Sequence, residues 1–160
     1  MAGKSASEVA LGLRIRAKGF GEASNIVGAE ACLAAGEYLV RSTPIDTGQA
    51  KSNWQASRGF PRTTTRRAYA VGKKGTTAEQ NISAAIAQIR AECASRTRNQ
   101  QMFLTNNLDY IEKLNKSGGN MGTPQFLQRA AQIARQVLRD NNLFTKALSG
   151  KAGVSSLGNI

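Results

Sequence analysis

The first 42 residues contain two segments that differ in the spacing of their apolar positions. Between residues 9 and 15, apolar side chains alternate with alanine, glycine or arginine. A period of two is typical of a β-strand, although leucine and alanine in this segment also permit a helix. The glycines at positions 19 and 21 are expected to end it. Residues 22–42 repeat apolar side chains at three- and four-residue steps, which predicts an amphipathic helix that ends before Pro44.

The next segment combines a turn, a short strand and a long loop. Asp46-Thr47-Gly48 is a turn signature, because aspartate accepts backbone N–H bonds and glycine readily adopts a positive φ. We expect a strand over residues 51–57, in which Trp54 anchors the core. Residues 59–75 have little hydrophobic pattern and are predicted to form a long basic loop or a hairpin.

The second half of the chain is predicted to begin with a helix and a strand. A helix over residues 77–96 carries its apolar residues on one face. Thr77 and Gln80 at its start fit a capping box, in which each side chain bonds to a free backbone N–H. A short apolar strand is expected at residues 101–105.

Two further helical segments are expected after that strand. Residues 110–114 match one helical turn, and residues 116–120 break it with glycines. The most regular apolar stripe runs over residues 124–138, with proline at its first helical position and Thr123 as its cap. The hydrophobic pattern then fades into a Gly/Ser-rich end.

These elements predict an α+β fold: a small mixed or antiparallel sheet flanked by about three helices, with a long basic loop and a flexible C-terminal tail. We expect a single domain over residues 9–140, preceded by a flexible N-terminus at residues 1–8. Residues 141–160 are expected to form a C-terminal tail or an inter-subunit arm. A chain of 160 residues is long enough to bury a core for such a domain.

The charge of the chain is strongly positive and unevenly distributed. The formal net charge is +12, and no acidic residue occurs between Asp46 and Glu79. Such a stretch attracts phosphate backbones or acidic protein surfaces, although a solvated basic face with no ligand fits equally well. Lys51 lies in this stretch. The residues that we regard as a candidate interface or DNA path are Arg58, Arg62, Arg66, Arg67, Lys73 and Lys74.

The sequence lacks the usual patterns of a catalytic or metal site. It has no histidine, and its closest carboxylate pair, Asp109 and Glu112, fits a solvated surface better than a catalytic pair. Cys32 and Cys93 fall on the apolar sides of helical patterns, so we expect reduced and buried thiols. Two isolated thiols cannot supply a four-ligand zinc shell. We therefore expect no enzyme activity, no cofactor and no metal.

Hydropathy predicts that the chain is not a membrane protein. No apolar run approaches the roughly 20 residues that span a bilayer. The first eight residues, MAGKSASE, lack the apolar centre of a secretory signal. We expect the protein to stay in the cytosol where it is made.

Two motifs, taken in order, resemble a known family. Thr43-Pro44-Ile45-Asp46-Thr47-Gly48, followed by Asn53-Trp54-Gln55 and Gly59-Phe60-Pro61, is similar to a "TPVDTG" turn with its following strand. Thr105-Asn106-Asn107 with Tyr110, Ile111 and Leu114 is similar to the family's "TNN..Y...L" segment, and Pro124-Gln125-Phe126 lies where the family begins its last helix. The chain thereby resembles the neck or tail-completion proteins of tailed bacteriophages. It departs from them in an arginine-rich loop and in the run KSGGNMGTPQF.

The resemblance implies a structural role in the virion. Members of this family are small α+β subunits that assemble as rings, typically six-fold, and join the DNA-filled head to the tail. The implied partners are further copies of the chain, head-completion, connector or portal-associated proteins, tail tube or sheath proteins, and the passing genomic DNA. The implied location is the neck of the virion, reached from the host cytoplasm during assembly.

Within this family pattern, certain residues are expected to shape the fold and its contacts. They are Asp46, Thr47, Gly48, Trp54, Asn106, Asn107, Tyr110, Leu114 and Phe126. Of these, Trp54, Tyr110 and Phe126, together with Ile111, are expected to anchor the core.

Two other classes of function compete with a neck subunit. A small basic protein could bind nucleic acid without sequence preference, through accumulated lysine and arginine. Aromatic stacking platforms are scarce in the basic stretch, where Tyr69 is the only aromatic residue well inside it. A small enzyme is the third alternative, and the absence of histidine argues against it.

Overall fold

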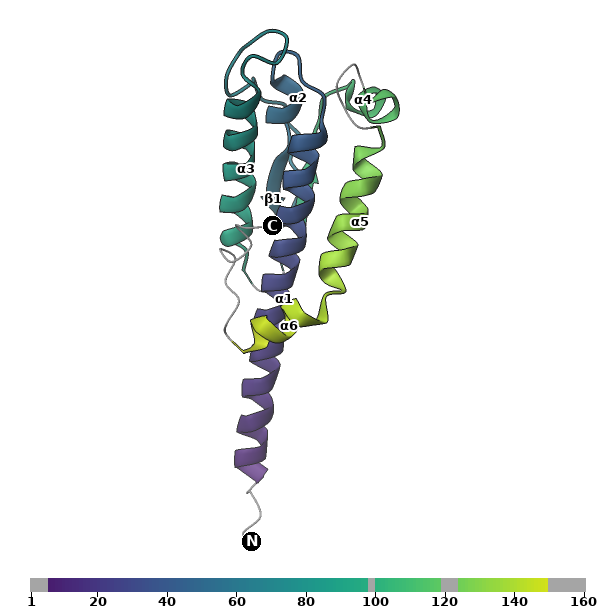
Figure 1. Ribbon diagram of the computed structural model, residues 1–160. Helices are drawn as coiled ribbons and strands as arrows, with labels where there is room; N and C mark the ends of the chain where they lie inside the picture. Colours follow the sequence, from purple (N-terminus) through teal and green to yellow (C-terminus); the bar gives the residue numbers. More distant parts are fainter. Residues whose placement is uncertain (1–5, 98–99, 119–123, 150–160) are drawn as a thin grey trace.

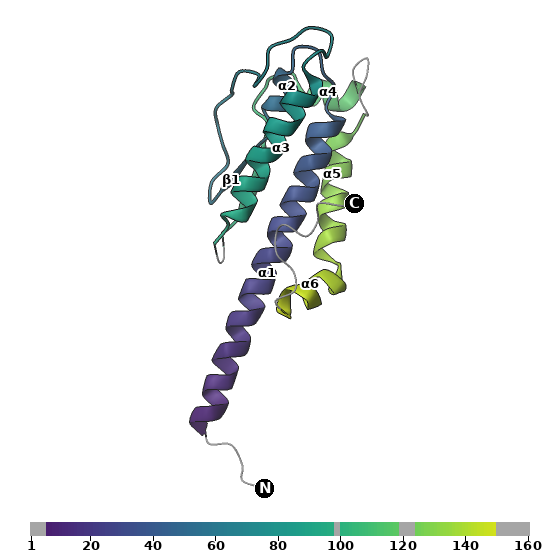
Figure 2. The ribbon, with the colours of Figure 1, turned by 60° about the vertical axis from the view of Figure 1, so that its left-hand side comes forward.

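The computed structural model describes residues 6–97, 100–118 and 124–149, and its central element is one long helix (Figure 1). This helix, α1, lies between α3 and α5, while α6 crosses it further toward its N-terminus. The N-terminal part of α1 extends past α6, away from the other elements (Figures 1 and 2). The helices are α1 (Ala6–Ser42), α2 (Gln49–Ser52), α3 (Ala78–Ala94), α4 (Ile111–Ser117), α5 (Phe126–Leu138) and α6 (Asn141–Leu148).

A two-stranded antiparallel sheet completes the described fold. β1 (Gln55–Arg58) pairs with β2 (Met102–Thr105), so that Gln55 lies opposite Thr105. β1 contacts α3, and β2 contacts α1. The predicted α+β class, with a small antiparallel sheet flanked by helices, is therefore confirmed.

The core lies where α1, α3, α5 and the sheet meet. Phe126 and Ile89 are fully buried, and Trp54 is 3% exposed. The Trp54 and Phe126 rings meet edge to face, with centroids 6.4 Å apart, an arrangement that adds to the stabilisation from burial. Gly36 lets α3 approach α1 closely, because a Cβ there would lie 2.9 Å from Cγ2 of Ile89.

The C-terminal end of α1 is buried, and polar side chains satisfy its carbonyl groups. The last carbonyls of a helix have no partner within that helix. The Nζ of Lys51 donates to the carbonyl oxygens of Val40 and Arg41 at 2.8 and 2.7 Å. Nε1 of Trp54 donates to Oγ1 of Thr43 at 2.7 Å, and that hydroxyl donates to the Leu39 carbonyl at 2.6 Å. A buried lysine, indole and threonine thus fix the chain reversal after α1.

The strand predicted over residues 9–15 is wrong, because these residues belong to α1. A strand needs a partner for its backbone groups, whereas a helix satisfies them within its own segment. Alanine, leucine and arginine in this segment are also favourable in helices. Gly19 and Gly21 lie inside the helix and do not end it. Although α1 has 37 residues, no helix in the described part of the chain is long and apolar enough to cross a membrane.

The strand predicted over residues 51–57 is only partly correct. One helical turn, α2, occupies its start, and β1 begins at Gln55. This segment forms a helical turn because the turn directs the side chain of Lys51 back to the end of α1. The predicted core role of Trp54, Phe126 and Ile111 is confirmed, but that of Tyr110 is wrong. Tyr110 precedes α4 and is 42% exposed, since Leu108 and Ile111 take the inward positions.

The capping arrangements predicted for α3 and α5 are wrong, although Thr77 stands at the N-cap position of α3 as predicted. Thr77 precedes α3 but makes no side-chain cap, because its hydroxyl donates to the Ala70 carbonyl at 3.1 Å. Pro124 is not the first residue of α5, which begins at Phe126 after Gln125 in a left-handed conformation. Thr123, the predicted cap, lies outside the described residues.

The chain ends contain more helix than the hydrophobic pattern predicted. Residues 6–8 of the expected flexible N-terminus belong to α1, and residues 1–5 lie outside the described part. Of the expected tail at 141–160, residues 141–148 form α6, which packs on α1 with Ala147 and Phe144 near Ala23. Asp140 caps this helix by accepting from the N–H groups of Asn142 and Leu143. Residues 150–160 are not described.

The two cysteines are free and buried, as predicted. Cys32 is on α1 and Cys93 on α3, and their thiols interact with each other. The hydrogen bond with the Cys32 thiol, and then burial, raise the pKa of Cys93 far above its ordinary value.

Replacing Trp54 by alanine should lower the free energy of unfolding by about 3–5 kcal/mol, because it removes a buried ring and its contact with Phe126. Urea unfolding monitored by circular dichroism measures this change. Tyr110→Ala is the matched control, with an expected loss of less than about 1 kcal/mol at its exposed site. Equal stabilities of the Trp54 variant and the wild type would contradict the role as core anchor.

The stability of the fold should rise with pH above 8 because of Lys51. Burial lowers the pKa of Lys51 to about 8 from 10.5; Arg41 adds to this effect and Glu79 opposes it. Between these values the unfolded chain holds a proton that the folded chain has lost, so stability increases with pH.

Lys51→Met should remove this dependence. The difference in unfolding free energy between wild type and variant should change by up to about 1.4 kcal/mol per pH unit in that window. Urea unfolding at several pH values from 7.5 to about 10 measures it, and Lys113→Met on the surface of α4 serves as the control. Parallel curves for wild type and Lys51→Met would show that Lys51 does not titrate as expected.

Candidate functional site

The candidate site is built around a basic loop, residues 59–75, which connects β1 to the turn before α3. No helix or strand is assigned within it. Figure 2 shows it running beside β1, on the side of the molecule away from α5 and α6. Buried polar side chains hold the loop along much of its length, so it has a defined path.

The middle of the loop is held by Asn53. Its Nδ2 donates to the Arg66 carbonyl and its Oδ1 accepts from the Arg66 N–H, both at 2.8 Å. This pair of bonds fixes Arg66 as a neighbouring strand would. Gln55 adds a bond from Nε2 to the Thr64 carbonyl at 2.9 Å. Asn53 is completely buried and Gln55 is 4% exposed, so all three bonds are partly shielded from water.

The following segment is held by Asn81 and Ser52. Asn81 Nδ2 donates to the Ala70 carbonyl at 2.8 Å, and its Oδ1 accepts from the Ala70 N–H at 3.1 Å. The Ser52 hydroxyl donates to the same Oδ1 at 2.6 Å and accepts from the Tyr69 N–H at 3.2 Å. Asn81 and Ser52 are both fully buried.

The predicted turn at Asp46-Thr47-Gly48 lies against the end of this loop. Gly48 has a φ of +87°, and a Cβ on it would lie 2.3 Å from Nδ2 of Asn81, so glycine is required. Asp46 accepts through its carboxylate from the Lys74 N–H and through its carbonyl from the Gly75 N–H, both at 3.0 Å. The aspartate therefore holds the far end of the loop. Thr47 is exposed.

The second motif contacts the first one directly. Nδ2 of Asn106 donates to the Ala50 carbonyl at 2.9 Å, and Nδ2 of Asn107 donates to the Arg62 and Thr64 carbonyls at 2.9 and 3.2 Å. Leu114 is half-buried against the core. Both asparagines thus fix segments that belong to the upstream motif and its loop.

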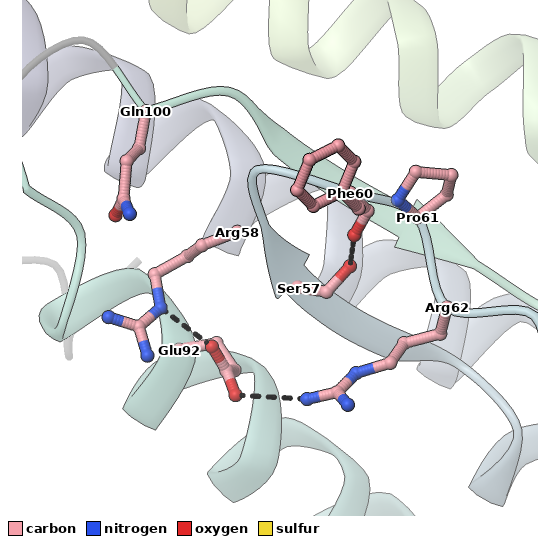
Figure 3. Close-up of a pocket in the computed structure, with 7 residues that line it drawn as sticks. All are labelled: Ser57, Arg58, Phe60, Pro61, Arg62, Glu92 and Gln100. Atoms are coloured by element: carbon pink, nitrogen blue, oxygen red, sulfur yellow. Dashed lines mark hydrogen bonds and ion pairs between the residues drawn. The ribbon is translucent and has the colours of Figure 1, made fainter.

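The first two arginines of the site share one carboxylate. Figure 3 shows Arg58 and Arg62 reaching Glu92 of α3 from opposite sides. Arg58 Nε is 2.9 Å from Oε2, and Arg62 Nη2 is 3.6 Å from Oε1. Arg58 also donates to the Ser95 carbonyl at 2.6 Å. Phe60, Pro61 and Gln100 complete a surface pocket of about 430 Å³ beside them.

The other four cationic side chains of the site are uncompensated. No carboxylate of the described residues pairs with Arg66, Arg67, Lys73 or Lys74. The Arg66 guanidinium lies over the Tyr69 ring, 5.0 Å from its centroid, and bonds to its hydroxyl. All six predicted residues lie on or beside one loop; in the described part of the chain these four have no carboxylate partner, whereas Arg58 and Arg62 share one.

The loop also exposes apolar side chains. Phe60 and Val71 are each 83% exposed, and Tyr69 is 41% exposed. Aromatic residues and arginine are the types enriched in protein interfaces. A fixed loop that presents such groups beside free cations is suited to binding a partner surface.

Sequence reasoning missed the role of Ser52, Asn53 and Asn81 in holding the loop, and it also missed the burial of Lys51. It counted Lys51 with the basic stretch, but this side chain is 4% exposed and caps α1. One signal was present in the sequence. Asn81 is a polar residue near the start of the predicted helix, and it occupies a position on the inward face, where an apolar residue is expected.

Comparison with known proteins gave no match. No family model, no curated protein and no solved structure matches this chain.

Asn81→Ala should loosen the basic loop, because the Ala70 N–H and the Ser52 hydroxyl lose their acceptor, and the Ala70 carbonyl keeps only the bond from Thr77. A lost buried hydrogen-bond partner costs about 1–3 kcal/mol, so cleavage by trypsin after Arg66 and Arg67 should accelerate roughly tenfold under native conditions. Mass spectrometry of timed digests measures the rate at each bond. Gln80→Ala, at an exposed neighbouring position on α3, should digest like the wild type. Unchanged cleavage of Asn81→Ala would mean that Asn81 does not hold the loop.

Proposed function

We propose that this chain is a structural subunit of a tailed bacteriophage that forms a ring at the neck and joins the DNA-filled head to the tail. The proposal begins with the ordered resemblance of two motifs to neck and tail-completion proteins. In this role the chain acts by stoichiometric assembly and not by catalysis.

Contact between the two motifs supports this proposal. β1 follows the first motif and pairs with β2, which leads into the second. Asn106 and Asn107 of the second motif then bond to backbone carbonyls of the first motif and of the loop. Residues 50 and 106, far apart in the sequence, thus depend on each other in the fold. This gives a physical reason for both motifs to occur together in one chain.

The observation that carries the proposal is the fixed conformation of the basic loop. Its backbone is held by Asn53, Asn81 and Asp46, while Phe60 and Val71 point into solvent. Burying such side chains against a partner is favourable, and little conformational entropy remains to be lost in the loop. In a cyclic ring each subunit uses two different patches, and the basic loop is proposed as one of them. The other partners of the ring are the connector and the tail.

Contact with nucleic acid is the second candidate. It is favoured by one observation: Arg66, Arg67, Lys73 and Lys74 have no carboxylate partner within the described residues. Four free cations could neutralise phosphates of passing DNA without reading its sequence. In a neck ring this contact would accompany assembly, whereas in a stand-alone DNA-binding protein it would be the whole function.

Charge reversal at Arg66 and Arg67 separates these alternatives. Supplied to a phage that lacks this gene, Arg66→Glu/Arg67→Glu should leave unjoined heads and tails, counted by electron microscopy. Arg129→Glu/Arg135→Glu, with the same charge change on the exposed side of α5, is the control and should allow joining. Normal joining by the loop variant would remove the loop from the assembly contact.

The nucleic-acid alternative has its own readout. Fluorescence anisotropy measures binding to a short DNA duplex at several salt concentrations. If both arginines contact phosphates, the slope of log K against log salt concentration should be smaller in magnitude by about 2 in the loop variant. Cryo-electron microscopy of the virion tests the neck proposal directly. If the neck density contains no copy of this chain, the neck proposal is rejected and nucleic-acid binding remains.

A further inference from the structure

A second feature of the molecule is an acidic cavity between α1, α5 and the start of α6, where these helices lie together (Figure 1). Its volume is about 490 Å³. Leu33, Tyr38, Val137 and Leu143 supply apolar wall, and Glu30, Glu37 and Asp140 supply carboxylates. Three of the ten acidic residues of a chain with net charge +12 therefore gather at one cavity. Arg41 is the one cationic residue among its described lining.

Glu30 is the group in this cavity that lacks a partner. Its side chain is 1% exposed, and neither carboxylate oxygen accepts a hydrogen bond from the described residues. The other two carboxylates are engaged: Glu37 pairs with Arg90 at 3.0 Å, and Asp140 caps α6. An ionised carboxylate buried without a partner is strongly unfavourable, so this site favours a ligand that supplies one.

The chemistry of the cavity selects the ligand class. A divalent metal ion requires several oxygen ligands, and the described residues contain no group of three or more acidic, cysteine or histidine side chains arranged to hold one. A cationic nitrogen needs only one carboxylate and can donate to both of its oxygens. The apolar walls then suit the methylene groups that carry such a nitrogen.

We propose that this cavity binds an ammonium or guanidinium group carried on a short aliphatic chain, with the cation at Glu30 and the methylenes against Leu33, Val137 and Leu143. Both a free aliphatic amine and a lysine or arginine side chain of a second copy have this chemistry. The site is separate from the basic loop and does not depend on the neck function.

Binding of a cation should depend on pH through Glu30. Burial, and then the neighbouring Glu37, raise the pKa of Glu30 to about 7, while Arg90 opposes them. Cys93 on α3 interacts electrostatically with the Glu30 carboxylate, and Arg41 and Asp140 also face the cavity. Because the cation binds the ionised form, a proton on Glu30 competes with it. Affinity should therefore be about tenfold weaker at pH 6 than at pH 8.

The test titrates n-butylammonium into the full chain and follows binding by calorimetry and by the methyl NMR signals of Leu33 and Leu143. Glu30→Gln keeps the shape of the side chain and should weaken binding at least tenfold at pH 8. Glu79→Gln removes an exposed carboxylate from α3 and should bind like the wild type. n-Butanol, which has the same chain without the charge, should bind more weakly and without the pH dependence.

Two results would overturn the proposal: equal amine affinity of Glu30→Gln and wild type, or equal binding of amine and alcohol. If Glu30→Gln does not fold, the carboxyl carbon signal of Glu30 in the wild type decides the question. Its titration midpoint should fall as amine is added, and an unmoved midpoint would reject the site.

Sedimentation velocity then identifies the natural source of the cation. Self-association that n-butylammonium reverses, and that Glu30→Gln lacks, would assign the cation to a second copy. Amine binding by a chain that remains monomeric would assign it to a free amine. Both results support the site, and neither depends on whether the chain is found in a phage neck.

Discussion

The fold depends on how the buried C-terminal end of α1 is satisfied. Its carbonyl groups accept bonds from Lys51, and Thr43 links the Trp54 indole to the Leu39 carbonyl. These contacts place α2 across the helix end, and α2 in turn places Asn53 against the basic loop. Trp54 meets Phe126 at the start of α5, so the same reversal also positions the last long helix. The sheet, the loop and α5 are thus tied to one helix terminus.

Local patterns predicted the parts of this fold that are determined locally. The spacing of apolar residues in α3, the short apolar run of β2 and the positive φ of Gly48 each depend on neighbours within a few positions. The failures involve distant partners. Residues 9–15 match a strand by period, but only the fold of the described residues shows that β1 and β2 pair with each other and that α1 continues through residues 9–15. A buried lysine or asparagine is likewise recognisable only when its acceptor is known, as with Lys51 and residue 40 or Asn53 and residue 66.

The candidate site shows the same limit in its electrostatics. Residues 47–78 contain no acidic side chain, which predicted a continuous positive surface. In the structure, Glu92 of α3 lies between Arg58 and Arg62, so the positive potential is reduced at that end of the loop. Exposed ion pairs of this kind contribute little stability, but they change which charges a partner meets. The free cations are concentrated instead from Arg66 to Lys74, near the exposed Tyr69 and Val71.

The loop and the Glu30 cavity represent opposite ways of placing polar groups in a protein. Around the loop, Asn53, Asn81 and Ser52 are buried with their hydrogen bonds made, so the ordering of the loop is completed during folding. A partner then meets a surface with few conformations left to lose, which favours binding. At the cavity, Glu30 is buried with no such bonds from the described residues. Its burial opposes folding whenever the carboxylate is ionised, and a cation that enters removes that opposition. Binding at the cavity should therefore stabilise the chain most at high pH, whereas the loop should be as well ordered before binding as after it.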